Sequence, residues 1–408
     1  MKIAVLVGKF PLLSETFVLN QITGLLDRGH QVDIFALWKS SDNKVHPDVI
    51  KYRLLDKCVY RDISDNYPLR ILHTAKKLFS NKEHFGKLIQ STNFIKYGNI
   101  ALSFNLFYTC LQFLEREPYD IIFCHFGTIG NIGSALQDIG LAKGKLVVVF
   151  HGADMSIALQ QNKNIYHRLF QNGDLFLPIS QYWKEKLISL GCKEEKILVH
   201  RMGIDVNNFS YKKNQLKGNE KIRICTVARL VEKKGVEYAI KAVSSIAKKR
   251  NDIEYHIVGS GPLEKPLKQL ISSLGMESVI KLHGWKTQDE VAQLLDKTNI
   301  FLSPSVTASD GDQEGIPVVL MEALAKGIPV VSTIHSGIPE LIKDGISGYL
   351  VPERDIQALI DKIKILIDQP EDWQRMGMEG RKFVDENYNI DKLNDRLVSI
   401  FQGIIRSS

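Results

Sequence analysis

Short, uninterrupted runs of apolar residues recur along the first half of the chain, with polar or helix-forming stretches between them. Continuous apolar runs of this kind are typical of parallel strands that are covered by helices on both faces of a sheet. One intervening stretch, residues 16–29, has the composition of a helix and ends at Gly29, a residue type common just past a helix end. The pattern therefore predicts a doubly wound α/β sheet with strands at 3–8, 32–37, 120–125, 145–150 and 174–180.

The same alternation begins again in the second half, after a stretch at 205–221 that is rich in Lys and Asn. A chain of 408 residues is also too long for one ordinary hydrophobic core. We therefore expect two Rossmann-like domains, one over residues 1–205 and one over 206–390, with 205–221 as the linker. The second set of strands is predicted at 222–229, 254–261, 279–284, 300–305, 330–333 and 348–351.

The composition, with 44% apolar and 24% charged residues, is that of a globular enzyme. Five cysteines are scattered without CxxC spacing, which argues against a disulfide framework or a zinc site and favours reduced thiols. No signal-peptide pattern follows the first strand, and no apolar run approaches the ~20 residues of a membrane span. We expect a cytoplasmic protein, either free or attached to the cytoplasmic face of the inner membrane.

The formal net charge of +7 is unevenly placed, and the basic bias is sharpest within residues 70–96. Lysines and one arginine are interleaved there with leucine, isoleucine and phenylalanine, a pattern that predicts a basic amphipathic helix pair. Such a surface can bind anionic lipid headgroups, and the alternative is an ordinary solvated helix face. No nucleic-acid partner is expected, because the basic residues form no recognisable reader motif and the isoelectric point of about 8.9 is modest.

Two glutamates, Glu314 and Glu322, lie around a glycine–proline turn in the segment 314–333. Pro317 suits the first position of a helix and Gly327 the position just past its end, so a short helix is predicted between them. Free amides at a helix start bind phosphate oxygens, and carboxylates beside it can accept hydrogen bonds from sugar hydroxyls. A buried helix with a salt-bridged glutamate is the alternative interpretation.

Polar residues and glycines also follow the carboxyl ends of predicted strands, the edge at which open α/β sheets bind ligands. Taken singly, a histidine at a strand end or a basic turn is more often structural than functional, so both interpretations stay open. The positions concerned are His125, His151, Asp154, Arg229, Gly259 and Gly261.

Four ordered motifs of the chain resemble glycosyltransferase family 4, whose members are retaining, nucleotide-sugar-dependent enzymes of the GT-B fold. They are MGIDVNNF (202–209), ARLVEKKG (228–235), IVGSGP (257–262) and EGIPVVLMEALAKGIPVVST (314–333). The N-terminal stretch FPLLSETFVLNQITGLLDRGHQV and the run VTASDGDQEGIP are similar to the subgroup that builds bacterial exopolysaccharides of the colanic-acid type.

The resemblance implies a division of the molecule by function. It implies two Rossmann-like domains that face a central cleft, with residues 1–205 binding the acceptor and residues 206–390 binding the nucleotide sugar. A C-terminal helix at about 391–408 is expected to cross back to the first domain.

The resemblance also implies roles for single residues. Arg229 and Lys234 match the family pair that neutralises the nucleotide diphosphate, as fixed cations do for a charged leaving group. Glu322 matches the glutamate that holds the ribose hydroxyls, Glu314 the one near the donor sugar, and His151 the histidine beside sugar and acceptor. His151, Glu314, Arg229 and Lys234 are therefore the expected catalytic residues. The donor site is expected to include Gly259, Gly261, Gly315, Ile316, Pro317 and Val318, and the sugar or acceptor contacts Ser14, Glu15, Thr16, His125, Asp154, Asp310 and Asp312.

Asp310 and Asp312 form a DxD pair, which invites a Mg²⁺ or Mn²⁺ interpretation. Because Arg229 and Lys234 already supply positive charge, we expect no metal and no other cofactor. Glu314 is the one tempting nucleophile for a double displacement. The resemblance favours a front-face substitution instead, in which the leaving phosphate helps to deprotonate the acceptor and Glu314 positions the donor and stabilises charge.

The expected activity is transfer of a hexose from UDP-glucose or UDP-galactose to a polyprenyl-diphosphate-linked saccharide. A dehydrogenase is disfavoured, because VGKFPLLSET stands where GxGxxG is needed after the first strand. A sugar-nucleotide epimerase is disfavoured by the ARLVEKKG pattern. A non-catalytic nucleotide-sugar-binding protein is the remaining alternative.

Overall fold

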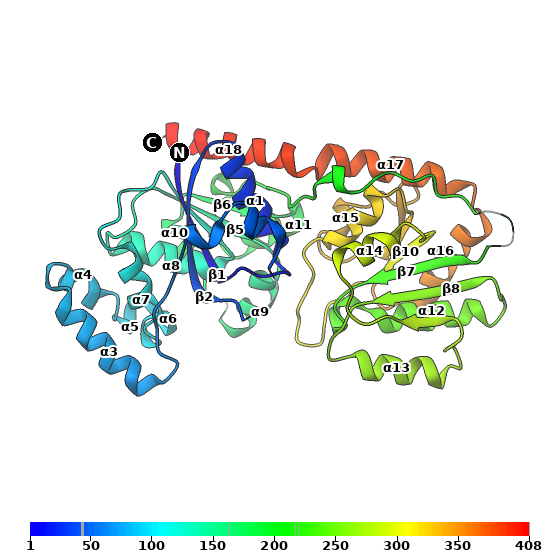
Figure 1. The fold of residues 1–408 in the computed structure, drawn as a ribbon, viewed down its shortest axis with the longest axis horizontal. Coiled ribbons are helices and arrows are strands. Elements are labelled where there is room, and N and C mark those ends of the chain that lie inside the picture. Colours follow the sequence, from blue (N-terminus) through cyan, green and yellow to red (C-terminus); the bar gives the residue numbers. More distant parts are fainter. Residues whose placement is uncertain (42–44, 163, 217, 219, 408) are drawn as a thin grey trace. The chain divides into compact units, whose positions relative to one another are not determined.

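The computed structural model describes residues 1–41, 45–162, 164–216, 218 and 220–407. The chain divides into two compact units (Figure 1). Unit 1 consists of Met1–Pro178, Lys184–His200 and Asn394–Ser408, and unit 2 of Ile179–Trp183 and Arg201–Leu393. The segment 205–221, interpreted above as a linker, belongs to unit 2, and its positions 217 and 219 lie outside the described residues.

Unit 1 contains a six-stranded sheet in the order β3-β2-β1-β4-β5-β6, with every neighbouring pair parallel. The five predicted apolar runs form five of these strands. The sixth, β3 (Cys58–Tyr60), was not predicted, because this edge strand has only three residues, all half-buried, and so is shorter than the apolar runs that indicate a strand. The other strands are β1 (Lys2–Phe10), β2 (Gln31–Lys39), β4 (Ile121–His125), β5 (Lys145–Phe150) and β6 (Leu175–Pro178).

Helices connect the strands of unit 1. The helix predicted at 16–29 is confirmed as α1 (Thr16–Asp27), with Gly29 at φ +76° just beyond it. The chain between β3 and β4 is built mainly from short helices, which include the basic region 70–96. The remaining helices are α2 (Pro47–Lys51), α3 (Tyr67–Ser80), α4 (Phe85–Gln90), α5 (Phe94–Tyr97), α6 (Asn99–Leu102), α7 (Asn105–Phe113), α8 (Gly127–Asp138), α9 (Ala153–Gln161), α10 (His167–Asn172) and α11 (Gln181–Ser189).

The last helix, α18 (Ile390–Arg406), starts in unit 2 and continues into unit 1. Within unit 1 it packs on α1: the side-chain amide of Asn394 donates to the carbonyl of Asn20 at 3.2 Å, and a Cβ atom on Gly24 would collide with Asn394. The guanidinium of Arg28 also donates to Asp395 at 2.8 Å.

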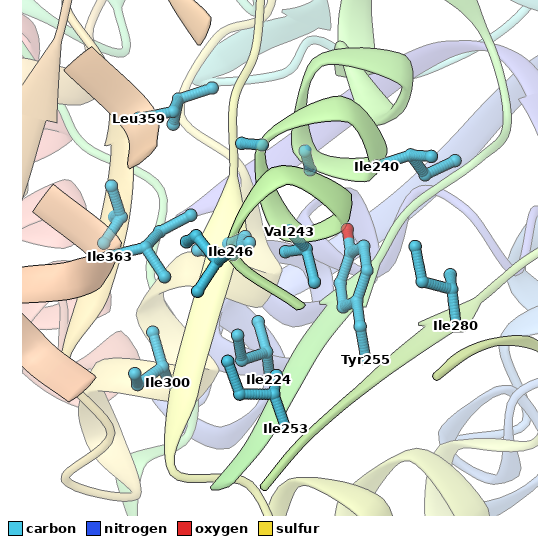
Figure 2. Packing of buried hydrophobic residues seen from close by; sticks show 14 of the residues in the cluster. Ile224, Ile240, Val243, Ile246, Ile253, Tyr255, Ile280, Ile300, Leu359 and Ile363 are labelled. Atoms are coloured by element: carbon cyan, nitrogen blue, oxygen red, sulfur yellow. The ribbon is translucent and has the colours of Figure 1, made fainter. Parts of the chain in front are cut away.

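Unit 2 contains a second parallel sheet, in the order β12-β11-β10-β7-β8-β9. Consecutive residues of its central strand point to opposite faces: Ile224 joins the core beneath α12 and α16 (Figure 2), whereas Cys225 packs with Leu320 of α15. The sheet is therefore covered on both faces, as predicted. Its strands are β7 (Ile222–Val227), β8 (Ile253–Val258), β9 (Ile280–Leu282), β10 (Ile300–Ser303), β11 (Val330–Thr333) and β12 (Gly348–Val351), and its helices α12 (Val236–Ala247), α13 (Glu264–Ser273), α14 (Gln288–Leu295), α15 (Val318–Ala325), α16 (Ile356–Asp368) and α17 (Asp372–Asn387).

Both sheets have the same strand order. Counted from the first strand of each unit, the order is 3-2-1-4-5-6, which is that of the Rossmann fold. The topological switch point lies between β1 and β4 in unit 1 and between β7 and β10 in unit 2. Ligand-binding loops are therefore expected after these four strands.

Candidate active site

The carboxyl end of β7 opens into the loop 228–235, which carries Arg229, Lys233 and Lys234. The amide of Leu230 donates to the carbonyl of Ser260 at 2.9 Å, so this loop lies beside the loop that follows β8. Arg229 is exposed, whereas Lys233 is buried in the short 3-10 turn that ends the loop. Arg229 is thus accessible to solvent, whereas Lys233 is buried and Lys234 is half-buried.

Glycines let the backbones of three loops approach closely at this point. Gly259 has a φ of +134°, and a Cβ atom there would lie 1.8 Å from the carbonyl oxygen of Ala228. Gly235 has a φ of +60°, and its Cβ would lie 1.9 Å from the carbonyl oxygen of Pro304. Gly261 follows in the same loop as Gly259. These glycines bring the loops after β7, β8 and β10 together.

Glu314 is the centre of a buried ion-pair cluster. Its side chain accepts a hydrogen bond from Nζ of Lys234 at 2.8 Å, and its second oxygen lies 3.4 Å from Nζ of Lys233. Burial opposes ionisation of the carboxyl, but the two lysines outweigh it and hold the pKa of Glu314 at about 2. The structure therefore joins two residues that were predicted on separate motifs, Lys234 and Glu314.

Lys233 also holds the DxD segment. Its Nζ lies 2.9 Å from a carboxylate oxygen of Asp312, and the amide of Asp312 donates to Asp310 at 2.9 Å. The sequence did not single out Lys233, because two adjacent lysines give no sign of which one points inward. Within the described ranges, no group of three or more His, Cys, Asp or Glu side chains is arranged to hold a metal ion. That the reaction needs no metal stays a prediction.

α15 lies where the glutamate pair predicted a helix. Pro317 is its N-cap, with an extended ψ of 122°, so the helix starts one residue later than expected, while Gly327 lies just past its end at φ +80°. Among the described residues, the first backbone amide here with a backbone acceptor is that of Leu320, which donates to Pro317. In the described part of the chain, the amides of Gly315, Ile316 and Val318 have no backbone acceptor, while Pro317 between them has no N–H.

Glu322 lies in the second turn of α15, apart from the lysine cluster. Burial raises the pKa of its carboxyl to about 7, and the charge of Lys326 opposes this rise only in part. The pKa of Glu322 is therefore shifted upward and that of Glu314 downward by their surroundings. This difference fits the separate roles predicted for them.

His151 lies in unit 1 just after β5, among aromatic side chains. The centre of its ring is 4.6 Å from that of Phe17 and 4.6 Å from that of Phe126, and its Nε2 is 3.2 Å from Nδ1 of His125. Burial lowers the pKa of His125 to about 3, and burial followed by the charge of His125 lowers that of His151 well below its ordinary value. The structure therefore brings these two predicted residues together as neutral imidazoles. Phe126 has a φ of +73°, a strained conformation of the kind that occurs at functional sites.

Asp154, close to His151, accepts hydrogen bonds from three backbone amides. One carboxylate oxygen accepts from the amide of Gly127 at 2.8 Å, and the other from the amides of His151 and Gly152 at 3.0 and 2.9 Å. Burial raises the pKa of Asp154 to about 6, against these amides, which lower it. The residue caps the start of α8 and shapes the His151 turn, so its predicted contact with sugar or acceptor meets a carboxylate that is already engaged.

Ser14, Glu15 and Thr16 lie at the start of α1, with Ser14 exposed and the other two half-buried. Burial raises the pKa of Glu15 to about 7. Phe17, the next residue, stacks against His151. This predicted group and His151 therefore belong to one region of unit 1.

His335 and Glu353 were given no role from the sequence. The amide of Glu314 donates to Nε2 of His335 at 3.0 Å, and Nδ1 of His335 lies 2.6 Å from Glu353. His335 follows β11 and Glu353 follows β12. The sequence places His335 at the end of a predicted strand, where no role beyond lining the site could be assigned to it, and it did not single out Glu353.

Comparison with known proteins identifies the family. Residues 14–208 match the model described as Glycosyltransferase Family 4, and residues 207–383 match the one described as Glycosyl transferases group 1. The chain is a family 4 glycosyltransferase. This glycosyltransferase is 40% identical over 408 residues to the putative colanic acid biosynthesis glycosyltransferase WcaL of Salmonella typhimurium, covering 99% of this chain and 100% of that protein. It is also 40% identical over 395 residues to the amylovoran biosynthesis glycosyltransferase AmsK of Erwinia amylovora, covering 95% and 96%.

A solved structure supports the fold of this glycosyltransferase. Anabaena HepE in complex with UDP is 18% identical, with a TM-score of 0.70 over 99% of this chain and 100% of that chain. An identity this low shows the fold alone. The fold, predicted from the family motifs, is GT-B.

Proposed function

We propose that this glycosyltransferase moves a hexose from a UDP-sugar to a hydroxyl of a lipid-linked oligosaccharide in exopolysaccharide biosynthesis, with retention of configuration. The observation that carries this proposal is the cluster at the switch point of unit 2, where Lys233 and Lys234 pair with Glu314 ahead of α15, on the loop that also carries the exposed Arg229. A departing nucleoside diphosphate needs fixed positive charge of this kind. The names of WcaL and AmsK, which refer to colanic acid and amylovoran, support the polysaccharide context.

The proposed donor is UDP-glucose or UDP-galactose, bound by unit 2. HepE, which shares the fold, has been solved with UDP and with UDP-glucose, and this supports a uridine nucleotide. The diphosphate would meet Arg229, Lys234 and the amides of Gly315, Ile316 and Val318. Glu322, one turn further along α15, is suited to hydrogen bonds with the ribose hydroxyls.

The proposed reaction is a front-face substitution. The bond from the anomeric carbon to the diphosphate breaks, the acceptor oxygen bonds to the same face, and the acceptor proton passes to the leaving phosphate. A covalent route would need a free carboxylate nucleophile, whereas the Glu314 carboxylate is held by Lys233 and Lys234. Because the two cations of the loop after β7 supply the charge that a metal supplies elsewhere, we propose a metal-independent reaction.

The proposed acceptor is a saccharide on polyprenyl diphosphate, bound by unit 1 near His151 and the start of α1. A lipid-linked acceptor lies at a membrane, and the surface of α3–α6 suits one (Figure 1). Among the described helices, none is long and apolar enough to cross a bilayer. The large apolar side chains exposed on this surface are Tyr67, Leu69, Ile71, Leu72, Phe79, Phe85, Ile89, Phe94, Ile95 and Leu102, and the exposed lysines include Lys76, Lys82 and Lys87.

Phe79→Glu should weaken binding to anionic vesicles by about tenfold or more, since burying one large apolar side chain contributes roughly 1.5–3 kcal/mol. Phe79 is 64% exposed in α3. The matched control is Ile50→Glu, because Ile50 is 68% exposed on the same unit but lies outside the α3–α6 surface. Cosedimentation with vesicles of phosphatidylglycerol and phosphatidylcholine measures the effect. Equal loss in both variants, or equal binding to purely neutral vesicles, would contradict a lipid-binding role for this surface.

The function itself is tested by incubating the protein with radiolabelled UDP-, GDP- and ADP-sugars and a polyprenyl-diphosphate-linked saccharide. We expect UDP and a glycosylated lipid as products, at an unchanged rate in EDTA. Nucleotide-sugar binding without turnover would instead indicate a binding protein, and a changed sugar on the nucleotide an epimerase. Loss of the rate in EDTA with recovery in Mn²⁺ would overturn the metal-independent mechanism.

A further inference from the structure

Glu314 stands at the end of a long irregular loop, residues 304–317, between β10 and α15. The loop has internal hydrogen bonds, such as those from the Ala308 amide to the Asp312 carbonyl at 3.0 Å and from the Gln313 side chain to the Thr307 hydroxyl at 3.1 Å, and contacts with neighbouring elements add to these in fixing where its side chains lie. Lys233 and Lys234 hold the side chain of Glu314 from the side of β7. The loop must also be held from the side of β11 and β12.

Glu353 holds the beginning of this loop. Its carboxylate accepts from the amide of Thr307 at 2.8 Å and from the Thr307 hydroxyl at 3.2 Å. The guanidinium of Arg354 hydrogen-bonds the carbonyl of the same threonine. Thr307 is therefore held at its amide, hydroxyl and carbonyl by Glu353 and Arg354, in the loop after β12.

His335 holds the end of the loop. Its Nε2 lies 3.0 Å from the amide of Glu314, and because a backbone amide can only donate, Nε2 must be the unprotonated acceptor. The proton of the neutral ring then lies on Nδ1, which donates to Glu353 at 2.6 Å. The imidazole is buried, so no solvent replaces either bond easily.

We propose that Glu353 and His335 are positioning residues for sugar transfer, which clamp both ends of the loop 304–317 and so fix Glu314 against Lys234. The Glu353 carboxylate hydrogen-bonds Thr307 directly, and it hydrogen-bonds the His335 ring, which in turn accepts from the amide of Glu314. Both parts of the loop therefore depend on the position of this one carboxylate. The His335 ring acts by accepting a hydrogen bond at Nε2 and donating one at Nδ1, which fixes the distance between Glu314 and Glu353. It does not contact the reacting sugar. This inference rests on the proposed function, in which Glu314 serves the donor sugar.

The first variants to compare are His335→Leu and His335→Gln. Leucine leaves the buried amide of Glu314 without an acceptor and should lower kcat roughly tenfold or more. Glutamine can accept from Glu314 and donate to Glu353 together, so it should restore most of that loss. Titration with UDP, which has no sugar, should show a much smaller loss than kcat in both variants, because the contacts assigned to Arg229 and Glu322 lie outside the loop and only the amides of Gly315 and Ile316 belong to it.

Glu353→Ala tests the other member of the clamp. It should lower kcat at least as much as His335→Leu does. The double variant His335→Leu/Glu353→Ala should lose little more activity than either single variant, because both changes break the same chain of hydrogen bonds from Glu353 through His335 to Glu314. Glu232→Gln is the matched control. The Glu232 carboxylate accepts hydrogen bonds from the amide and hydroxyl of Ser309 in the same loop, at 2.9 and 2.6 Å, but it is not hydrogen-bonded to Glu314. We expect its kcat to stay at the wild-type value.

The outcomes separate this inference from the proposed function. A wild-type protein that transfers no sugar from any nucleotide sugar overturns the function. With an active wild type, the clamp is wrong if His335→Leu keeps its kcat, if glutamine fails to rescue, or if Glu232→Gln loses as much as Glu353→Ala. Should His335→Leu fail to fold in a thermal melt, the glutamine variant, Glu353→Ala and the control still decide the question.

Discussion

Lys234→Ala should lower kcat/KM for sugar transfer by roughly 100- to 1,000-fold, the loss typical of removing one preorganised group at a transition state. Nζ of Lys234 lies 2.8 Å from Glu314, at the carboxyl end of β7 where the diphosphate is proposed to bind. The loss should fall on kcat more than on KM, because charge on the leaving diphosphate grows as the bond to the sugar breaks. Initial rates of UDP release at varied donor concentration measure both constants.

Lys241→Ala is the matched control for this variant. Lys241 is a half-buried lysine of α12 that pairs with Glu237 at 3.0 Å, an i,i+4 contact that contributes about 0.3–0.5 kcal/mol to stability. Its removal should leave the rate of transfer unchanged. A Lys234→Ala protein that loses less than about tenfold while remaining folded would place the diphosphate elsewhere.

Glu314→Gln should lower kcat by about 100-fold and still form product with the anomeric configuration of the donor. Glutamine keeps the shape of the side chain but leaves Lys233 and Lys234 without their shared carboxylate, and breaking a buried ion pair costs about 3–5 kcal/mol. Residual transfer is expected because the proposed front-face reaction forms no bond to this residue. Proton NMR of the product linkage, with rates from the same assay, measures the result.

A trapped covalent glycosyl–Glu314 adduct would contradict this expectation and establish a double displacement. Glu237→Gln, a half-buried position on α12, is the control for loss of a carboxylate in the same unit. The pKa of Glu314 also has a consequence for stability. A carboxyl whose pKa falls from 4.5 to about 2 on folding contributes stability that is present above pH 4.5 and lost as the pH falls towards 2.

The sequence predicted the sheet of each unit well, because most strands are buried on both faces and therefore appear as continuous apolar runs. Ile224 and Cys225 show why: adjacent residues of β7 enter cores on opposite faces of the sheet. The edge strand β3 was missed for the opposite reason, since it is short and half-buried. The start of α15 differed by one residue, because proline can stand at the N-cap as well as at the first helical position.

The candidate site was predictable where a residue type implies its chemistry, and less so where the role depends on a partner distant in sequence. Lys234 and Glu314 were predicted singly, but their 2.8 Å contact crosses eighty positions of the chain. Lys233, next to Lys234, looked like a solvated charge until its burial was known. For Asp154 the sequence predicted a contact with sugar or acceptor. In the structure its carboxylate accepts hydrogen bonds from backbone amides instead, an arrangement that no sequence pattern reveals.

The repeated strand order has a practical consequence for engineering. The loops after the first and fourth strands of each unit are structural equivalents, yet the loop 228–235 of unit 2 carries three cations and the loop 11–15 of unit 1 carries none. One scaffold thus appears twice, and under the proposed function its charged version would bind the nucleotide and its neutral or acidic version the saccharide. Exchange of residues 11–15 and 125–128 among related enzymes should therefore change which saccharide is extended while the chemistry of the donor half is inherited intact.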